Sequence, residues 1–219
     1  MKRDITTAVI AMLVFTVLIG IVYPLAITGV GQAVFPGNAN GQQIRVGDRV
    51  VGSRIIGQSF AAPVIGKNGK PEESEEEVVT EPDERYFQSR PSATEGGAYN
   101  ASASTFSNRG PNGRNTEEAD AENLRAYLEL ERPYDPSLTS ARVPVDAVNT
   151  SASNLDPEIS QANAWIQAHR IAAVRYLPLA RVDELIAEHT DGRGLGFSGE
   201  PGVNVLELNL ALDRLTGGR

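Results

Sequence analysis

Residues 5–35 read ITTAVIAMLVFTVLIGIVYPLAITGVGQAVF, and these 31 consecutive positions contain no Asp, Glu, Lys, Arg or His. A helix of about 20 apolar residues suffices to cross the ~30 Å hydrocarbon core of a bilayer. Eleven of residues 5–23 are Ile, Leu, Val or Phe, and each favours insertion by roughly 0.3 to 0.6 kcal/mol at the helix centre. The stretch predicts one transmembrane helix, with Tyr23 as an interface residue and Pro24 as a helix break.

The alternative for this stretch is a cleaved secretory signal, whose apolar region spans about 7 to 15 residues and ends at a small-x-small site. Residues 26–33 are small enough to contain such a site. The apolar run is longer than a signal requires, however, and this length favours an uncleaved membrane helix.

Lys2 and Arg3 come directly before the apolar stretch, and Arg45, Arg49 and Arg54 follow it. Basic residues next to a membrane helix tend to stay on the cytoplasmic side. We therefore expect residues 1–4 to form a cytoplasmic stub, residues 5–35 the transmembrane helix and its exit, and residues 36–219 one extracytoplasmic soluble domain. The predicted location is the cell (inner) membrane, crossed once.

The composition restricts what the soluble part can be. The chain has 219 residues, no cysteine and a formal net charge of −8, so it lacks disulfides, thiolate nucleophiles and the basic surface that binds nucleic acid. The negative charge is local, because eight carboxylates lie among residues 72–84, which contain no Lys or Arg. We expect an acidic loop at about residues 67–84 that is solvated and has no regular structure.

The pattern of the remaining residues indicates an α+β fold, with extended elements in the first half and helices in the second. Residues 44–46 and 50–56 are rich in β-formers on either side of Gly47 and predict a hairpin. Residues 143–148 alternate and predict an edge strand, because Pro144 cannot donate to a neighbour.

Four helices are predicted in the second half, over residues 116–130, from Asp156 or Ser160 to 176, from Pro178 to about 189, and over 203–215. In the second helix, the side chains that recur at helical spacing and predict its buried face are Trp165, Ala168, Ala172 and Tyr176. In the third helix they are Val182, Leu185, Ile186 and His189. Gly217 is expected to end the last helix.

The residues give no catalytic constellation and no metal site. Residues 194–199 read GLGFSG and match the dinucleotide fingerprint, which requires a preceding strand and a helix that starts within it. Here a helix precedes the motif and Pro201 follows it, so we interpret the motif as an interhelical loop. His169 and His189 lack metal-ligand spacing and are expected to pack or to lie at the surface. No catalytic residue, metal ligand or bound cofactor is predicted.

Several blocks of the sequence resemble the C subunit of the Kdp potassium-transporting P-type ATPase of bacteria and archaea. The matching blocks keep their order along the chain and lie at residues 23–25, 28–29, 51–60 (VGSRIIGQSF), 86–93 (YFQSRPSA), 143–146 (VPVD), 151–160 (SASNLDPEIS), 170–175, 181–182, 189–190, 199–206 and 209–213. The resemblance covers essentially the whole chain outside the acidic stretch.

The resemblance implies an accessory subunit of a high-affinity, ATP-driven potassium uptake complex. Its implied partners are a potassium-translocating subunit, an ATP-hydrolysing subunit and a small single-helix subunit. The family is described as a stabiliser of the complex and as a catalytic chaperone that raises the ATP affinity of the hydrolysing subunit. ATP is therefore expected to act through the complex. No bound cofactor is expected on this chain itself.

The family's polar motif S-G-G-S-N-x-G-P, which has been likened to a nucleotide-binding signature, corresponds to residues 104–111 here. Its matching positions, and the weak nucleotide-binding candidates, are Ser104, Ser107, Asn108 and Gly110. Thr105 and Phe106 replace the two central glycines, and side chains at these positions hinder a close approach of the backbone to a phosphate. The acidic stretch before Tyr86 is also longer than is usual in the family.

Small residues of the apolar helix distinguish a subunit from a protein that is only tethered. Gly20, Gly29 and Gly31 would let the backbones of partner helices approach closely, so they are the candidate contacts with other subunits. The alternative function is a freestanding, membrane-tethered extracytoplasmic binding protein, for which such small residues are not needed.

Overall fold

The computed structural model describes residues 2–66, 69–74, 77–78, 80–104, 110 and 112–217. The chain divides into two compact units, Met1–Ser53 and Arg54–Arg219, which are described separately.

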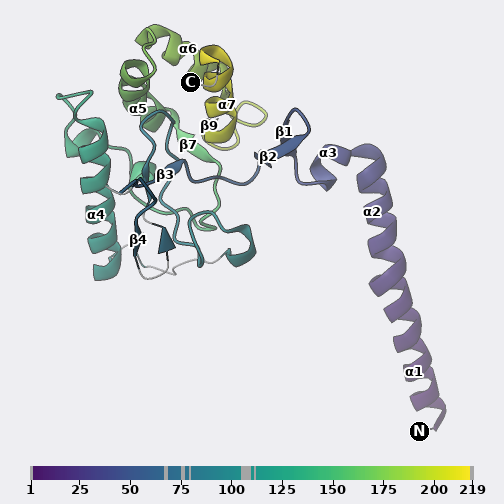
Figure 1. Cartoon of the computed structure of the whole chain (residues 1–219). Helices are drawn as coiled ribbons and strands as arrows, with labels where there is room; N and C mark the ends of the chain where they lie inside the picture. Colours follow the sequence, from purple (N-terminus) through teal and green to yellow (C-terminus); the bar gives the residue numbers. More distant parts are fainter. Residues whose placement is uncertain are drawn as a thin grey trace. The chain divides into compact units, whose positions relative to one another are not determined.

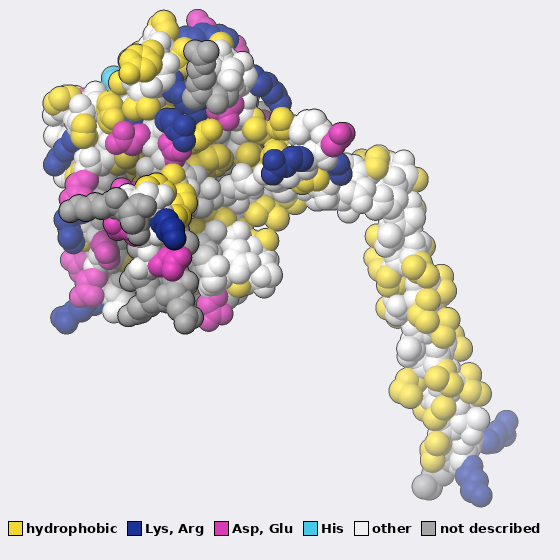
Figure 2. Space-filling model, in the orientation of Figure 1, with side chains coloured by type: hydrophobic (Ala, Val, Ile, Leu, Met, Phe, Trp, Pro, Cys, Tyr) yellow, Lys and Arg dark blue, Asp and Glu magenta, His cyan; other side chains and the backbone are white. Residues whose placement is uncertain are grey.

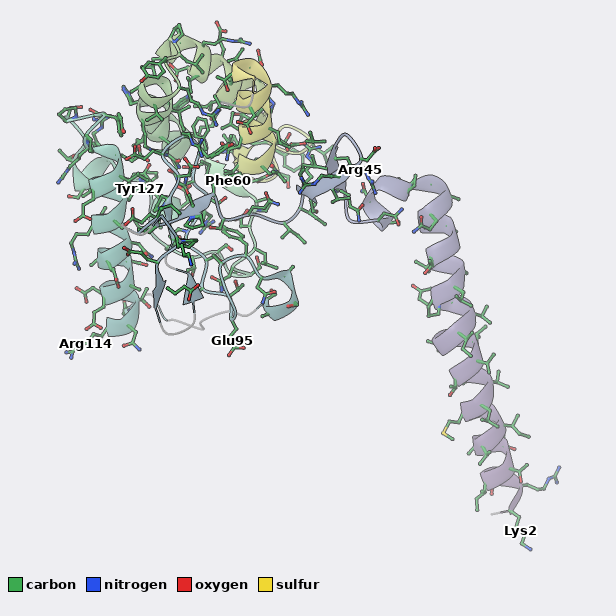
Figure 3. The ribbon with its side chains drawn as sticks, in the orientation of Figure 1. Lys2, Arg45, Phe60, Glu95, Arg114 and Tyr127 are labelled. Carbon is green, nitrogen blue, oxygen red and sulfur yellow. The ribbon has the colours of Figure 1, made fainter. Side chains whose placement is uncertain are left out.

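A long apolar helix makes up most of the first unit (Figure 1). It consists of α1 (Lys2–Val17), the π-helical turn η1 (Leu18–Val22) and α2 (Tyr23–Val34). The whole run of 33 residues, Lys2–Val34, is apolar enough to cross a membrane, and none of its most apolar window is buried. Figure 2 shows hydrophobic side chains along its length, and Figure 3 places Lys2 at its N-terminal end.

The predicted helix break at Pro24 is wrong, because the helix continues to Val34. Proline has no N–H and its ring collides with the carbonyl four residues earlier, so an uninterrupted α-helix would be disrupted here. The chain accommodates Pro24 in the first turn of α2, directly after η1, where the Tyr23 N–H donates to the Leu18 carbonyl in the wider π pattern.

The first unit ends in a short helix and a hairpin. α3 (Pro36–Ala39) follows Phe35, and β1 (Gln43–Val46) pairs antiparallel with β2 (Arg49–Ser53). The hairpin predicted around Gly47 is confirmed, although its second strand ends at Ser53. Gly47 has φ +60, a backbone conformation that glycine adopts without steric cost.

The second unit has short strands first and helices later, which confirms the α+β prediction (Figure 1). Its first part contains β3 (Ala61–Pro63), β4 (Glu73–Ser74), β5 (Glu77–Val78), β6 (Thr80–Pro82) and the 3-10 turn η2 (Ala101–Ala103). Its second part contains α4 (Arg114–Glu131), η3 (Ser140–Arg142), η4 (Val145–Ala147), β7 (Glu158–Ser160), α5 (Gln161–Val174), α6 (Leu179–Glu188), β8 (Thr190–Asp191), β9 (Gly202–Asn204) and α7 (Val205–Thr216).

The main core lies between a small antiparallel sheet, in the order β7-β9-β8, and the helices α5, α6 and α7. Its buried members are Phe87, Ile159, Ala164, Ala168, Ile171, Ala172, Val182, Leu185, Ile186, Val203, Val205, Leu208 and Leu212. Side-chain caps set the starts of two helices: Ser160 accepts from the Asn163 N–H at α5, and Asn204 accepts from the Glu207 N–H at α7. Gly217, with φ +67, ends α7 as expected.

A second apolar cluster joins α4 to α5. Its buried members are Tyr127, Leu128, Leu138, Ala147 and Ile166. Figure 3 shows Arg114 at one end of α4, well away from Tyr127 on the same helix. The apolar contacts of α4 therefore come from its C-terminal half.

Two sequence predictions about this unit are wrong. Residues 143–148 form no strand, because η3 and η4 turn the chain there and the Ala147 N–H donates to the Pro144 carbonyl. On α5, Trp165 and Tyr176 are exposed and the buried face includes Ala164 and Ile171. The short side chain of Ala164 lets the helix lie close to the core, whereas Tyr176 follows the helix end and has φ +56.

The acidic stretch contains more regular structure than expected among its described residues. β4 pairs with β5, and β6 pairs with β3, each antiparallel. The described side chains of residues 69–73 and 80–82 are exposed, in agreement with a solvated position. The last two acidic residues are bound to the domain: Asp83 pairs with Arg85, and Glu84 accepts from the Tyr134 hydroxyl. The Arg85 guanidinium lowers the pKa of Asp83.

Candidate functional site

Arg170 lies in the centre of the second unit and is fully buried. α5 carries it among apolar residues, and its guanidinium donates to four acceptors from three parts of the chain. The Nε atom donates to Glu131 Oε1 at 3.0 Å, Nη2 to Gln167 Oε1 at 3.0 Å, and Nη1 to the carbonyls of Glu84 and Tyr86. Arg170 therefore fixes an irregular segment to two helices.

Glu131 is the anionic partner in this group, at the C-terminal end of α4, and only 1% of its surface is exposed. Burial raises the pKa of its carboxyl to about 7, against the opposing effect of the Arg170 charge. Its second oxygen, Oε2, is buried and has no hydrogen-bond partner among the described residues. A buried carboxyl with one satisfied oxygen gains a proton more easily than a solvated carboxyl.

Residues 84–88 are held by side-chain amides and not by a neighbouring strand. The Phe87 N–H donates to Asn209 Oδ1 and the Phe87 carbonyl accepts from Asn209 Nδ2, both at 2.9 Å. Gln167 makes the same pair of bonds with the backbone of Gln88, at 2.7 and 3.0 Å. α5 and α7 thus satisfy the backbone of this segment, whose Phe87 side chain lies in the core.

Arg175 extends the same arrangement beyond the end of α5. Its guanidinium lies 4.7 Å from the centre of the Tyr86 ring and donates to Asp213 Oδ1 at 2.9 Å and to the Arg85 carbonyl at 2.8 Å. The Tyr86 hydroxyl also donates to Asp213. Tyr86, Arg175 and Asp213, from the sequence blocks 86–93, 170–175 and 209–213, therefore meet at one place.

Arg90 joins the next part of this segment to residues 149–156. It donates to Asp156 Oδ2 at 3.1 Å and to Asn149 Oδ1 at 2.9 Å. Ser92 donates to the Asn154 carbonyl at 2.8 Å. Gly57 is required beside them, because a Cβ there would lie 2.7 Å from the Asp156 carbonyl oxygen. These polar groups bind one another, so the arrangement holds the domain's own loops in place.

The candidate nucleotide-binding residues are only partly described. Ser107 and Asn108 lie outside the described residues. Ser104 donates to the Ser153 carbonyl at 3.2 Å, and the Gly110 carbonyl accepts from the Gly113 N–H at 2.9 Å. Ser104 and Gly110 are thus engaged in local hydrogen bonds, and their role toward a nucleotide stays a prediction.

The three glycines proposed as partner contacts on the apolar helix have space beside them for another helix. A Cβ built on Gly20 or Gly29 would have no neighbour within 4 Å, and one on Gly31 would meet only Ala39 Cβ, at 3.9 Å. These glycines are not needed for packing inside the first unit. Their role in contacts with partner helices stays a prediction.

His169 lies in α5, His189 directly follows α6, and the glycine-rich motif lies in a loop. His169 and His189 are both partly buried, and His189 Nδ1 lies 2.9 Å from the Leu185 carbonyl. Residues 194–199 form a tight loop between β8 and β9, where Gly194 and Ser198 form a bridge. No group of three metal-ligating side chains occurs within the described part of the chain.

Sequence reasoning missed the group formed by Glu131, Gln167 and Arg170. A signal was available for one of them, because Arg170 stands among Ala168, Ile171 and Ala172 on the buried face of α5. A charged residue in that position requires a partner. Its identity depends on α4, which is distant in the sequence.

One helix long and apolar enough to cross a membrane, followed by an α+β domain whose polar residues bind its own loops, is the arrangement of a membrane-anchored protein. A family model described as "KdpC: K+-transporting ATPase, c chain" matches residues 5–214. The chain is 46% identical to the potassium-transporting ATPase KdpC subunit of Mycobacterium tuberculosis (strain H37Rv) over 216 residues, which are 98% of this chain and 100% of the relative. It is 44% identical to the KdpC subunit of Methylococcus capsulatus, over 95% of this chain and 96% of the relative. It is also 44% identical to the KdpC subunit of Streptomyces coelicolor, over 97% of this chain and 93% of the relative.

The chain belongs to the KdpC family and is a subunit of the Kdp potassium-transporting ATPase complex.

Proposed function

We propose that the chain stabilises the assembled potassium uptake complex and, as a catalytic chaperone, raises the ATP affinity of the hydrolysing subunit. The observation that carries this proposal is the helix Lys2–Val34, which is uncharged from Ile5 onward, is apolar enough to cross a membrane and has no buried residue. Its side chains and its open glycines, Gly20 and Gly29, are available to partner helices within a membrane. The proposed partners are the potassium-translocating, ATP-hydrolysing and small single-helix subunits.

The proposed topology places residues 1–4 in the cytoplasm and residues 36–219 outside. Lys2 and Arg3 support this orientation, since basic residues beside a membrane helix favour the cytoplasmic side. ATP is then on the opposite side from the soluble domain. An effect on ATP affinity must pass through the membrane, which requires that this subunit bind one state of its partner more tightly than another.

The surroundings of α4 also support an indirect effect on ATP. This helix begins just after residues 104–111, and helix N-termini attract phosphates. However, Glu117 lies in its first turn, and Glu118 and Asp120 follow. Their negative charge opposes a polyphosphate at this end of the helix.

Two measurements on the whole complex test the proposal. The complex purified with this chain is expected to be recovered in higher yield, and to have a lower KM for ATP, than the remaining subunits purified without it. The isolated full-length chain in detergent is expected to bind ATP no more tightly than about 1 mM, because the described residues form no phosphate cradle and Thr105 and Phe106 replace the two central glycines of the family's polar motif. Unchanged yield and KM without the chain would contradict the proposal, and micromolar ATP binding by the isolated chain would contradict the indirect route.

A further inference from the structure

Two large apolar side chains are exposed at the tip of the loop between β8 and β9, residues 192–201. Leu195 is 91% exposed and Phe197 is 76% exposed, two positions apart. Both lie outside the two apolar clusters of the domain. Exposed apolar side chains that sit together mark an interaction site more often than isolated ones do.

The 192–201 loop is held in one shape by its own hydrogen bonds. The Gly194 N–H donates to the Ser198 carbonyl at 2.7 Å, and the Ser198 N–H donates back to the Gly194 carbonyl at 2.8 Å. Across the base of the loop, Arg193 Nη2 lies 2.6 Å from Glu200 Oε2. A loop that is ordered before binding loses less conformational entropy when a partner covers it.

The backbone at the tip is strained. Leu195 has φ +54, in the left-handed region that bulky residues rarely adopt. Such strain occurs mainly at binding and switch sites. Here it is accompanied by exposure of both apolar side chains, so neither the core nor local packing explains why Leu195 and Phe197 occupy the tip.

The loop leaves the domain beside the point where the chain arrives from the membrane helix. Arg54 is the first residue of the second unit. Its Nη2 lies 2.9 Å from Asp191 Oδ2, directly before the loop, and its Nε lies 3.2 Å from Glu207 Oε2. The base of the loop therefore lies beside the residue at which the second unit begins.

The charges around the loop favour a protein surface over a lipid surface. Asp191, Glu200 and Glu207 outnumber Arg54 and Arg193 there, and Arg193 is the one basic residue in the sequence from 190 to 202. Anionic lipid headgroups repel such a surface, since peripheral membrane binding relies on clustered Lys and Arg. An uncharged apolar pocket in a protein does not repel it.

We propose that the 192–201 loop inserts Leu195 and Phe197 into an apolar pocket on another subunit of the ATPase, outside the hydrocarbon core. This inference rests on the proposed assembly function and assigns the contact that the soluble domain makes. A bound copy of the chain is then held at two places, by its apolar helix and by this loop. Because the two contacts are linked by a short chain, each raises the effective concentration of the other.

A double variant with Leu195→Ser and Phe197→Ser tests the contact in the assembled complex. We expect it to dissociate from the detergent-solubilised complex at least about tenfold faster than the wild-type chain, because each apolar side chain loses a pocket. The matched control carries Val145→Ser and Tyr176→Ser, two other exposed apolar residues of the domain, 68% and 94% exposed. Equal melting temperatures of the two full-length variants show that both fold.

Two outcomes overturn the proposal: dissociation of the loop variant at the wild-type rate, and equal acceleration in loop and control variants. If the wild-type chain itself does not co-purify with the complex, the proposed function fails. If the wild-type chain co-purifies and the loop variant dissociates at the wild-type rate, the inference about the loop fails and the proposed function stands.

Photocrosslinking distinguishes a protein pocket from a lipid surface. A benzophenone amino acid replaces Phe197 in the complete complex in membranes, and the same amino acid at Tyr176 serves as the control. An adduct between residue 197 and another subunit supports the proposal. An adduct with lipid alone, or none with any subunit, overturns it.

Discussion

At the scale of single residues, the buried pair of Glu131 and Arg170 determines how one irregular segment is held. Removing one partner of a buried ion pair is strongly destabilising, by about 3 to 5 kcal/mol, because the other charge remains buried. Arg170 also satisfies two backbone carbonyls, those of Glu84 and Tyr86. Loss of Arg170 would therefore remove the donor from the carbonyls of Glu84 and Tyr86 and the ion-pair partner from the Glu131 carboxylate.

The raised pKa of Glu131 predicts a pH dependence of stability. A carboxyl with a higher pKa in the folded than in the unfolded state stabilises the fold below its unfolded value of 4.5, and this contribution is lost as the pH rises through about 7. The free energy of unfolding of the wild type, minus that of Glu131→Gln, is therefore expected to fall as the pH rises from 5 to 8. Its slope is at most about 1.4 kcal/mol per pH unit.

Thermal unfolding of both full-length proteins in detergent at several pH values measures this difference. Comparing the two removes the contributions of Asp83 and Asp135, whose lowered pKa values favour the fold above their own range. A difference that stays constant from pH 5 to 8 would show that Glu131 remains ionised throughout.

The sequence was informative about residues whose role is local. Gly47 and Gly217 were expected to be a turn residue and a helix end, and the structure confirms both; of the two expected caps, Asp156 and Ser160, it shows Ser160. Their preferences depend on the backbone of a few neighbours. Arg170 and Asn209 depend on partners 39 and 122 residues away, which local patterns do not specify.

At the scale of elements, the apolar helix provides a test of the glycine contacts. Gly29→Leu is expected to reduce co-purification with the other subunits, because a bulky side chain separates closely packed backbones. The substitution raises helix propensity and apolarity, so a loss would not arise from a weaker helix. Gel analysis of complexes pulled down through another subunit measures the effect.

Val30→Leu is the matched control, since it adds one methylene at the next position of α2, where the side chain is 57% exposed. Recovery of Gly29→Leu equal to that of Val30→Leu would show that Gly29 does not face a partner. The helix would then serve only to hold the chain in the membrane.

The acidic stretch can be shortened without breaking the strand pair that flanks it. Pro63 of β3 lies opposite Thr80 of β6, so a two-residue Asn-Gly turn can replace residues 64–79. We expect the variant to unfold within about 0.5 kcal/mol of wild type, because no described side chain of residues 64–73 is buried. Thermal unfolding measures this.

The same variant is expected to assemble and to leave the apparent potassium affinity unchanged at physiological ionic strength. The field of exposed carboxylates is screened over about 8 Å at that salt concentration. A several-fold weaker potassium affinity in a complex of normal composition would assign these acidic residues a role in gathering cations.

Elements were predictable where their pattern was long. The helices α4, α5, α6 and α7 were expected close to their observed bounds, because apolar spacing was combined with boundary residues such as Ser160, Pro178 and Gly217. Strands of two or three residues, such as β7 and β9, are too short to show alternation. Residues 143–148 alternate without forming a strand, because their backbone bonds are made within turns.

At the scale of the whole molecule, the orientation in the membrane is the main untested expectation. The chain has no native cysteine, so single cysteines can report it. In intact cells a membrane-impermeant maleimide is expected to label Gln43→Cys, whereas Asp4→Cys is expected to react only after lysis. Both substitutions leave Lys2 and Arg3 in place. The opposite labelling pattern would place the soluble domain in the cytoplasm and would favour direct contact with ATP.

The overall class was predictable because it depends on one contiguous stretch. An uncharged run of 31 residues predicts a membrane helix without reference to the rest of the chain. The docking tip at Leu195 and Phe197 was not predictable, since residues 194–199 gave only a glycine pattern. Their exposure depends on the conformation of the loop, in which Leu195 has a positive φ and Gly194 and Ser198 are hydrogen-bonded, and the glycine pattern does not specify that conformation.

The hairpin β1–β2 gives the connection to the membrane a mechanical property. Gln43 and Ser53 are paired directly, so a force along the chain would separate the strands one residue pair at a time from their open end. The same force acts on the folded domain through Arg54, which is bonded to Asp191 and Glu207, but we expect the hairpin to open first because its residue pairs break one at a time. At about 3.3 to 3.6 Å per residue, opening the hairpin lengthens the connection by roughly 30 Å. Single-molecule pulling should record this extension before the domain unfolds, and its absence would show that the hairpin resists force as firmly as the core.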